Sequence, residues 1–354
     1  MYKHNLSTIL FFFTCILLLT SCKKEIAKHD SMMPLEAKAA PSATVSVFAS
    51  GFTNPRGLEW APDGNLYLAE AGSGVTAETG GRISRITPAG AVSTVTTDLP
   101  TMNFEGEAAG PMDLTFLNNT LYVLSDGGAS LNVSRPAGIY RVNSNGSTTV
   151  VADLGAWQRS HPVANPPQDF LADGSWYNVA AVRGDLYALD ANHGELVRVS
   201  TSGAVSRVAD LSATQGHSVP TALDYRGNFY IGNLGLFTPT APGQEKIIKV
   251  SPDGSVQDVA TGLSAIVGLV IDQRSWMYVL ELGDVPFPFA PGLGKIIAIS
   301  PSGEQTVLVA ASTGFTDLTH PTAMTMGPDG NLYVSNKGFG GAPGSGQVLK
   351  VTLH

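Results

Sequence analysis

Six short stretches of this chain share one pattern of apolar and polar positions, in which a tyrosine stands between two apolar residues. Each follows a tight-turn sequence such as PDG, LNN or YRG, where Gly and Asn tolerate positive φ and Asp can bond its own backbone. This alternation is typical of the second strand of a β-hairpin. The six predicted strands contain Tyr67, Tyr122, Tyr187, Tyr230, Tyr278 and Tyr333.

The same pattern extends into a larger repeat around each tyrosine strand. An apolar strand such as GLEWA, DLTFL or ALDYR precedes it, and a strand such as RISRIT or KIIKVS follows. Five copies then turn through a Gly into a fourth strand. A unit of four short antiparallel strands, recurring at roughly 40 to 65 residues, is typical of propeller blades. The sequence therefore predicts an all-β fold, a six-bladed β-propeller.

The sixth copy ends at the C-terminus without its fourth strand. The isolated segment ATVSVFA at 43–49 resembles the missing strand. We expect it to pair as the outer strand of the last blade, which closes the ring and covers an open edge. The propeller is thus predicted to span 43–354.

The first 42 residues carry a different signal. Lys3, the apolar run ILFFFTCILLL and then LTSC ending at Cys22 resemble the signal peptide and lipobox of bacterial lipoproteins. An ordinary signal peptide or a membrane anchor is the alternative, although the apolar run is short for a membrane span. The resemblance implies a signal peptide at 1–21, acylation of Cys22, and a flexible lipidated tether at 22–42. We expect export and anchoring to the bacterial envelope, at the outer membrane.

Composition narrows the classes of partner. The net charge is −8 and the pI about 5.3, which argues against a nucleic-acid partner because binding phosphates needs a basic face. The only cysteines are Cys15 and Cys22, so the propeller must be held by packing rather than by disulfides. We expect a monomer that touches the membrane through its lipid anchor alone.

The chain also resembles a known family over residues 45–353. The segments ASGFTNPRGLEWAPDGNLYLAEAG, VPTALDYRGNFYIGNLG, VPFPFAPG and HPTAMTMGPDGNLYVSNKGFGGAPGSGQVLKV are similar to the ScyD/ScyE proteins. The resemblance implies a six-bladed NHL-like propeller. It implies no particular activity, because most members of that family have none established.

Loop lengths suggest which face of the propeller carries a binding site. The turns between strands one and two, and three and four, are short, whereas the connections at the opposite end are long. Long loops on a rigid scaffold are where binding usually resides. Phe287 and Phe289 in the loop VPFPFAPG are candidate binding residues on this face, or they fix the loop to its neighbour.

Two rings of side chains are expected near that face. The first ring stands three residues after each tyrosine and consists of Glu70, Ser125, Asp190, Asn233, Glu281 and Asn336. All six side chains carry oxygen, so Glu70, Asp190 and Glu281 are candidate ligands for calcium, the candidate cofactor. The alternative is a polar ring that bonds water and loop backbone.

The second ring lies at the start of the inner strands. Calcium-dependent lactonase propellers place Asn and Asp ligands at such positions, and their NGL corresponds to RGL here, so Arg56 replaces a ligand with a cation. A shift of one residue would bring Asp113 and Asn178 into that ring. Arg56, Asp113 and Asn178 are therefore candidate binding residues.

Histidines provide the remaining catalytic candidates. His193, His217 and His320 fall in loops of the long-loop face, where a histidine could act as a general base or cap backbone groups. No HExxH, GxSxG or P-loop motif is present. The leading interpretation is a tethered binding or scaffold module for a protein, glycan or small molecule. The alternative is a calcium-assisted hydrolase or lyase with its site at the channel mouth.

Overall fold

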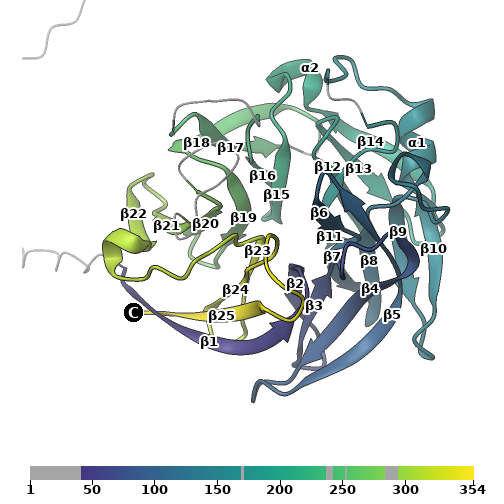
Figure 1. The fold of residues 1–354 in the computed structure, drawn as a ribbon. Coiled ribbons are helices and arrows are strands. Elements are labelled where there is room, and N and C mark those ends of the chain that lie inside the picture. Colours follow the sequence, from purple (N-terminus) through teal and green to yellow (C-terminus); the bar gives the residue numbers. More distant parts are fainter. Residues whose placement is uncertain (1–40, 169–170, 237–241, 252, 284–293) are drawn as a thin grey trace, which may run out of the picture. The chain divides into compact units, whose positions relative to one another are not determined.

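The computed structural model describes residues 41–168, 171–236, 242–251, 253–283 and 294–354, and Phe287 and Phe289 lie outside these ranges. Residues from Ala40 to the C-terminus form one compact unit. In that unit, six sheets of antiparallel strands are arranged around a centre (Figure 1), which confirms the predicted six-bladed β-propeller. Among the described residues, no helix has the length and apolar character needed to cross a membrane.

Each blade is built from consecutive strands, except for the sixth. Blades one to three comprise β2 (Pro55–Trp60), β3 (Leu66–Glu70), β4 (Ala77–Ile86), β5 (Val92–Phe104) and β6 (Glu107–Ala109); β7 (Pro111–Leu117), β8 (Thr120–Ser125), β9 (Gly138–Val142) and β10 (Thr148–Asp153); and β11 (Trp176–Val182), β12 (Asp185–Asp190), β13 (Glu195–Val199) and β14 (Val205–Asp210).

Blades four to six comprise β15 (Pro220–Tyr225), β16 (Phe229–Asn233), β17 (Glu245–Val250) and β18 (Val256–Leu263); β19 (Ile266–Ile271), β20 (Met277–Glu281), β21 (Lys295–Ile299) and β22 (Gln305–Val309); and β23 (Ala323–Met326), β24 (Leu332–Asn336), β25 (Gly346–Leu353) and β1 (Ala43–Phe52). Short helices lie in the connections: η1 (Ala129–Leu131), α1 (Leu154–Ser160), α2 (Ser212–Gln215) and η2 (Ala311–Thr313).

The ring closes as the sequence predicts. Strand β1 pairs antiparallel with β25, from Ala43 opposite Leu353 to Phe52 opposite Gly346. In Figure 1 these strands, from opposite ends of the coloured chain, lie side by side. The two chain ends of the propeller therefore share one sheet, in which β1 covers the edge of β25 and completes the four strands of the last blade.

The repeated phrase PDGNLY forms the same turn in blades one and six. Gly64 and Gly330 adopt φ of 79° and 75°, a region that glycine enters without steric cost. In each copy the tyrosine hydroxyl donates to the turn aspartate at 3.0 Å, from Tyr67 to Asp63 and from Tyr333 to Asp329. The PDGNLY sequence thus recurs because it encodes a hairpin turn that is stabilised by a hydrogen bond between its own tyrosine and aspartate.

Apolar side chains fill the spaces between neighbouring blades. Six buried clusters of described residues each combine strands of two adjacent blades, so every junction around the ring has its own apolar layer. The large side chain of Trp176, at the junction of blades two and three, is fully buried. This packing fixes the inner strands, which carry the candidate site.

One element departs from the predicted blade. The outer strand of blade one, β5, runs on to Phe104 and turns back into the short strand β6, a fifth strand that the predicted four-stranded blade does not contain. Met102 and Ala109 from this extension pack against Leu131 and Val133 of blade two. The hairpin β5–β6 therefore folds over part of the propeller rather than ending at the blade edge.

Candidate functional site

The ring three residues after the tyrosines is buried and bonded within its own blades. In four blades the side chain accepts a hydrogen bond from the backbone N–H of the loop before the inner strand. These pairs are Glu70 with Thr53 at 2.7 Å, Asp190 with Ser175 at 3.0 Å, Glu281 with Ser264 at 2.9 Å and Asn336 with Thr319 at 2.8 Å. Asn233 and Ser125 are buried at the matching positions, and the Ser125 hydroxyl donates to the carbonyl of Asp126.

The three acids of this ring also have basic partners nearby. Arg82 lies 2.6 Å from Glu70, His193 lies 2.7 Å from Asp190, and Lys295 lies 3.1 Å from Glu281. Within the described ranges, no group of three or more His, Cys, Asp or Glu side chains is arranged to hold a metal ion. The predicted calcium ring at Glu70, Asp190 and Glu281 therefore stays a prediction, and the geometry gives these acids a role in fixing loops.

The candidate histidines lie in three different parts of the ring. His193 is buried against Asp190 in blade three, whereas His217 is half-buried in the loop before β15. His320, in the loop before β23, stacks on Phe339 with ring centroids 4.4 Å apart. The structure does not bring the three histidines together into one constellation.

Arg56 lies at the long-loop end of the channel under the β5–β6 hairpin. It is only 7% exposed, and its Nη2 donates to the carbonyl of Ala108 at 2.6 Å. The guanidinium also lies 5.9 Å from the ring centroid of Phe339. Burial lowers the pKa of Arg56 from its usual value. Arg56 is therefore covered at the mouth where the sequence placed a site.

A second contact spans the channel at the same level. The Tyr177 hydroxyl of blade three donates to the carbonyl of Thr322 in blade six at 3.4 Å. These blades are opposite each other in a ring of six, so this contact crosses the centre. Tyr177 and the β5–β6 hairpin therefore lie at the level of Arg56, and the site predicted at the channel mouth stays a prediction.

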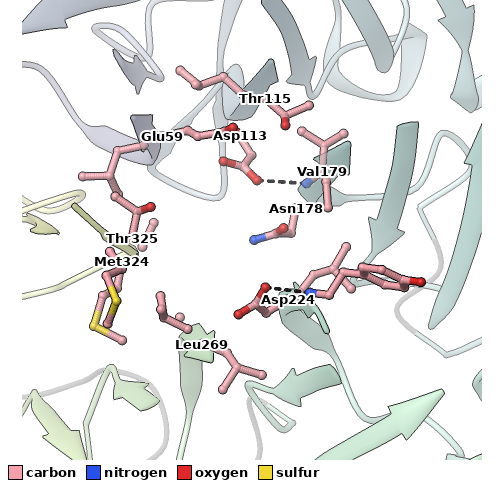
Figure 2. Close-up of a pocket in the computed structure, with 18 of the residues that line it drawn as sticks. Glu59, Asp113, Thr115, Asn178, Val179, Asp224, Leu269, Met324 and Thr325 are labelled. Atoms are coloured by element: carbon pink, nitrogen blue, oxygen red, sulfur yellow. Dashed lines mark hydrogen bonds between the residues drawn. The ribbon is translucent and has the colours of Figure 1, made fainter. Parts of the chain in front are cut away.

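A cavity of about 390 Å³ lies further along the channel, between the inner strands (Figure 2). Asp113 and Asn178, both expected from the sequence, line it and point into the same space. The sequence reasoning missed four further polar residues of the lining, which occupy one column of the inner strands. They are Glu59, Thr115, Asp224 and Thr325. In GLEWA, DLTFL, ALDYR and AMTMG, a polar residue directly follows the Leu or Met at the same position of the inner strand. This repeated polar position is the sequence signal that could have identified them.

Hydrogen bonds from neighbouring blades orient the acids of this cavity. Val179 N–H donates to Asp113 Oδ2 at 2.9 Å, and Ile271 N–H donates to Asp224 Oδ2 at 2.6 Å. Gly57 leaves the space that the Asp113 side chain occupies, because a Cβ there would collide with the carboxyl group. The acids are thus held in fixed positions by the fold.

Burial shifts the acid–base behaviour of these groups. It raises the pKa of Asp113 to about 8, with a further contribution from the charge of Glu59. It raises the pKa of Glu59 to about 7 and also raises the pKa of Asp224. Groups that exchange a proton near neutral pH can act as general acids and bases. The same carboxyls also join adjacent blades, so a structural role accounts for part of their placement.

Comparison with known proteins supports the class of fold. No protein-family model matches the chain, and no curated protein matches it. Solved structures with this fold include a gluconolactonase of Xanthomonas campestris, at 12% identity over 88% of this chain and 90% of that one, with a TM-score of 0.56. A PQQ-bound aldose sugar dehydrogenase of Streptomyces coelicolor shares 13% identity over 89% of this chain and 99% of that one, with a TM-score of 0.58.

A third similar structure is a virginiamycin B lyase of Staphylococcus aureus, which shares 15% identity over 88% of this chain and 99% of that one, with a TM-score of 0.50. At these identities the likeness defines a class, the six-bladed β-propellers, and no particular activity. The resemblance to the ScyD/ScyE proteins is not supported by a family model.

Proposed function

We propose that this propeller is an enzyme for a small molecule, of the hydrolase or lyase class, with its site in the central cavity. The observation that carries the proposal is that Glu59, Asp113 and Asp224 face one cavity while burial raises the pKa of each. Two proteins with this fold are named as a gluconolactonase and a lyase, which favours this alternative over the scaffold interpretation. No contact in the described residues favours the scaffold role specifically.

The acid–base pair follows from the order of the pKa values. Asp113 has a pKa of about 8 and Glu59 of about 7, so near neutral pH Glu59 loses its proton first and Asp113 retains its own. In hydrolysis, the Glu59 carboxylate would take a proton from water as the water oxygen attacks the electrophilic carbon. Asp113 would then donate its proton to the leaving oxygen, while Asn178 offers a hydrogen bond to the substrate.

The first prediction concerns turnover. The full-length protein is screened against lactones and esters, with product release followed at constant pH. Asp113→Asn, which retains an oxygen to accept from Val179 but carries no exchangeable acid proton, should lower kcat by about 10²-fold to 10⁴-fold. Asp185→Asn is the matched control, since Asp185 pairs with exposed Arg198 outside the cavity. A correctly folded Asp113→Asn variant with unchanged kcat on an accepted substrate would show that the cavity is not the catalytic site.

We also propose that the propeller is tethered to the bacterial envelope, at the outer membrane, through an acylated Cys22. The support is the LTSC sequence after a short apolar run. We expect mass spectrometry of the membrane-bound protein to find Cys22 as a diacylated N-terminal residue. Cys22→Ala should leave the chain unprocessed or release it in soluble form. A processed Ala variant that stays in washed membranes would contradict lipid anchoring.

A further inference from the structure

The two sides of the central cavity differ in chemistry. Glu59, Asp113 and Asn178, from blades one to three, form a polar wall. Leu269 and Met324, from blades five and six, lie on the opposite side in Figure 2, which also carries the polar residues Asp224 and Thr325. A cavity of about 390 Å³ is within the size range of small-molecule sites. A ligand with a polar end and an apolar end therefore fits a cavity that offers Glu59, Asp113 and Asn178 on one side and Leu269 and Met324 on the other.

The polar wall has no positive partner inside the cavity. Among the described residues that line it, none is a Lys, Arg or His. Within the described ranges, the ion pairs do not involve Glu59, Asp113 or Asp224. Arg226 is the basic group that acts on Asp224, and its Nη2 donates instead to the carbonyl of Gln273 at 2.8 Å. The region between Asp113 and Glu59 therefore lacks a counter-charge.

We propose that the ligand of this cavity is a small amphipathic amine, whose ammonium group binds between Asp113 and Glu59 and whose apolar body packs on Leu269 and Met324. The inference rests on the proposed function for the location of the site and adds the class of ligand. An ammonium has three donors and no acceptor, which suits two carboxylates and the Asn178 amide. Thioether and aliphatic side chains adapt to an apolar body of varied shape.

The charge of the ligand should determine how tightly the cavity binds an amine compared with an alcohol or a carboxylate of the same shape. Buried carboxyls are costly to ionise without a partner, and an ammonium supplies that partner inside the cavity. An alcohol of the same shape offers one hydrogen bond and no charge, so it cannot offset the negative charge of an ionised carboxylate in the cavity. A carboxylate would add a further negative charge beside Glu59 and Asp113. The cavity should therefore rank ligands of one shape as amine, then alcohol, then carboxylate.

The test uses three probes of nearly one shape on the full-length protein at pH 8. Cyclohexylmethylamine, cyclohexylmethanol and cyclohexanecarboxylate are titrated by calorimetry. We expect the amine to bind at least tenfold more tightly than the alcohol, and the carboxylate not to bind. Asp113→Asn and Glu59→Gln should each weaken the amine at least tenfold and leave the alcohol unchanged. Asp185→Asn, the matched control outside the cavity, should bind the amine as wild type does.

Other outcomes would overturn the inference in distinct ways. Equal affinity for amine and alcohol would show that charge is not recognised. Competition by millimolar calcium chloride, with no loss on Met324→Ala, would show a simple cation site rather than an amphipathic one. Because Asp113→Asn could disturb the blade contact, Glu59→Gln provides an independent reading. If the lactone and ester screen finds turnover that depends on Asp113 while no amine binds, this inference fails and the proposed function stands.

Discussion

A chain that lacks residues 43–49 is expected to aggregate or to melt far below the intact protein. These residues form most of β1, which supplies the outer strand of blade six by pairing with β25. The Phe48 ring, lost with them, lies 5.0 Å from Tyr333 and 6.3 Å from Trp60, so it joins blade six to blade one. The deletion removes the pairing, an aromatic contact and the cover of a strand edge together. We expect a loss of about 5 kcal/mol or more, close to the whole stability of many domains.

The measurement is urea unfolding of the truncated protein beside a matched chain that begins at Pro41. The matched chain retains all of β1 and removes only residues before the first described one. It should unfold as the full-length protein does. If the chain without 43–49 unfolds cooperatively at nearly the same urea concentration, β1 would not close the ring in solution.

The blade count and the closure could be predicted because they depend on local chemistry that the sequence repeats. A turn of the PDG type needs a residue with positive φ, which is Gly64 in blade one. It also needs an aspartate that accepts hydrogen bonds from the following residues, which is Asp63. The missing fourth strand of the last copy then left one place for residues 43–49. Strand pairing follows from such patterns since period-two alternation specifies which face is buried.

The candidate site was harder to predict because hydrogen bonding to the backbone is invisible in a sequence. Glu70 and Glu281 looked available for a cation, yet each accepts from a loop N–H and lies beside a basic side chain of its own blade. The cover over Arg56 depends on a hairpin, β5–β6, whose course is set by apolar contacts with blade two. Such long-range contacts have no periodic signal in the chain.

Asp113 and Asn178 were candidates from their position in the sequence, whereas Glu59 and Asp224, which line the same cavity, were not. The inner strands are mostly apolar, and a single polar residue in one of them does not by itself indicate a site. Only the alignment of four blades makes those polar residues one column that faces the channel. The pKa shifts depend on how much water the cavity excludes, which is a property of the assembled ring.

The free energy of unfolding should fall as the pH rises, through the protons on Asp113 and Glu59. Burial raises the pKa of Asp113 from 3.8 to about 8 and that of Glu59 from 4.5 to about 7. Between the unfolded and folded values, the folded state therefore binds more protons than the unfolded state. Stability then decreases by up to about 1.4 kcal/mol per pH unit for each such carboxyl, and the slope ends above the folded pKa.

Replacing Asp113 by Asn should remove one of these contributions, because the amide does not ionise and its oxygen still accepts from Val179. In urea unfolding at pH 5, 7 and 9, we expect the variant to match wild type most closely at pH 5 and to exceed its stability at pH 9.

Asp329→Asn is the control, because the pKa of Asp329 is lowered in the folded state rather than raised. Hydrogen bonds from Lys350 and Asn331 lower the pKa of Asp329, so its contribution is lost only as the pH falls through that lowered value. Asp329→Asn should lower stability by the same amount at all three pH values. Parallel pH profiles for wild type and Asp113→Asn would mean that Asp113 ionises as freely in the folded state as in the unfolded chain, and the cavity would then lack its proposed proton donor.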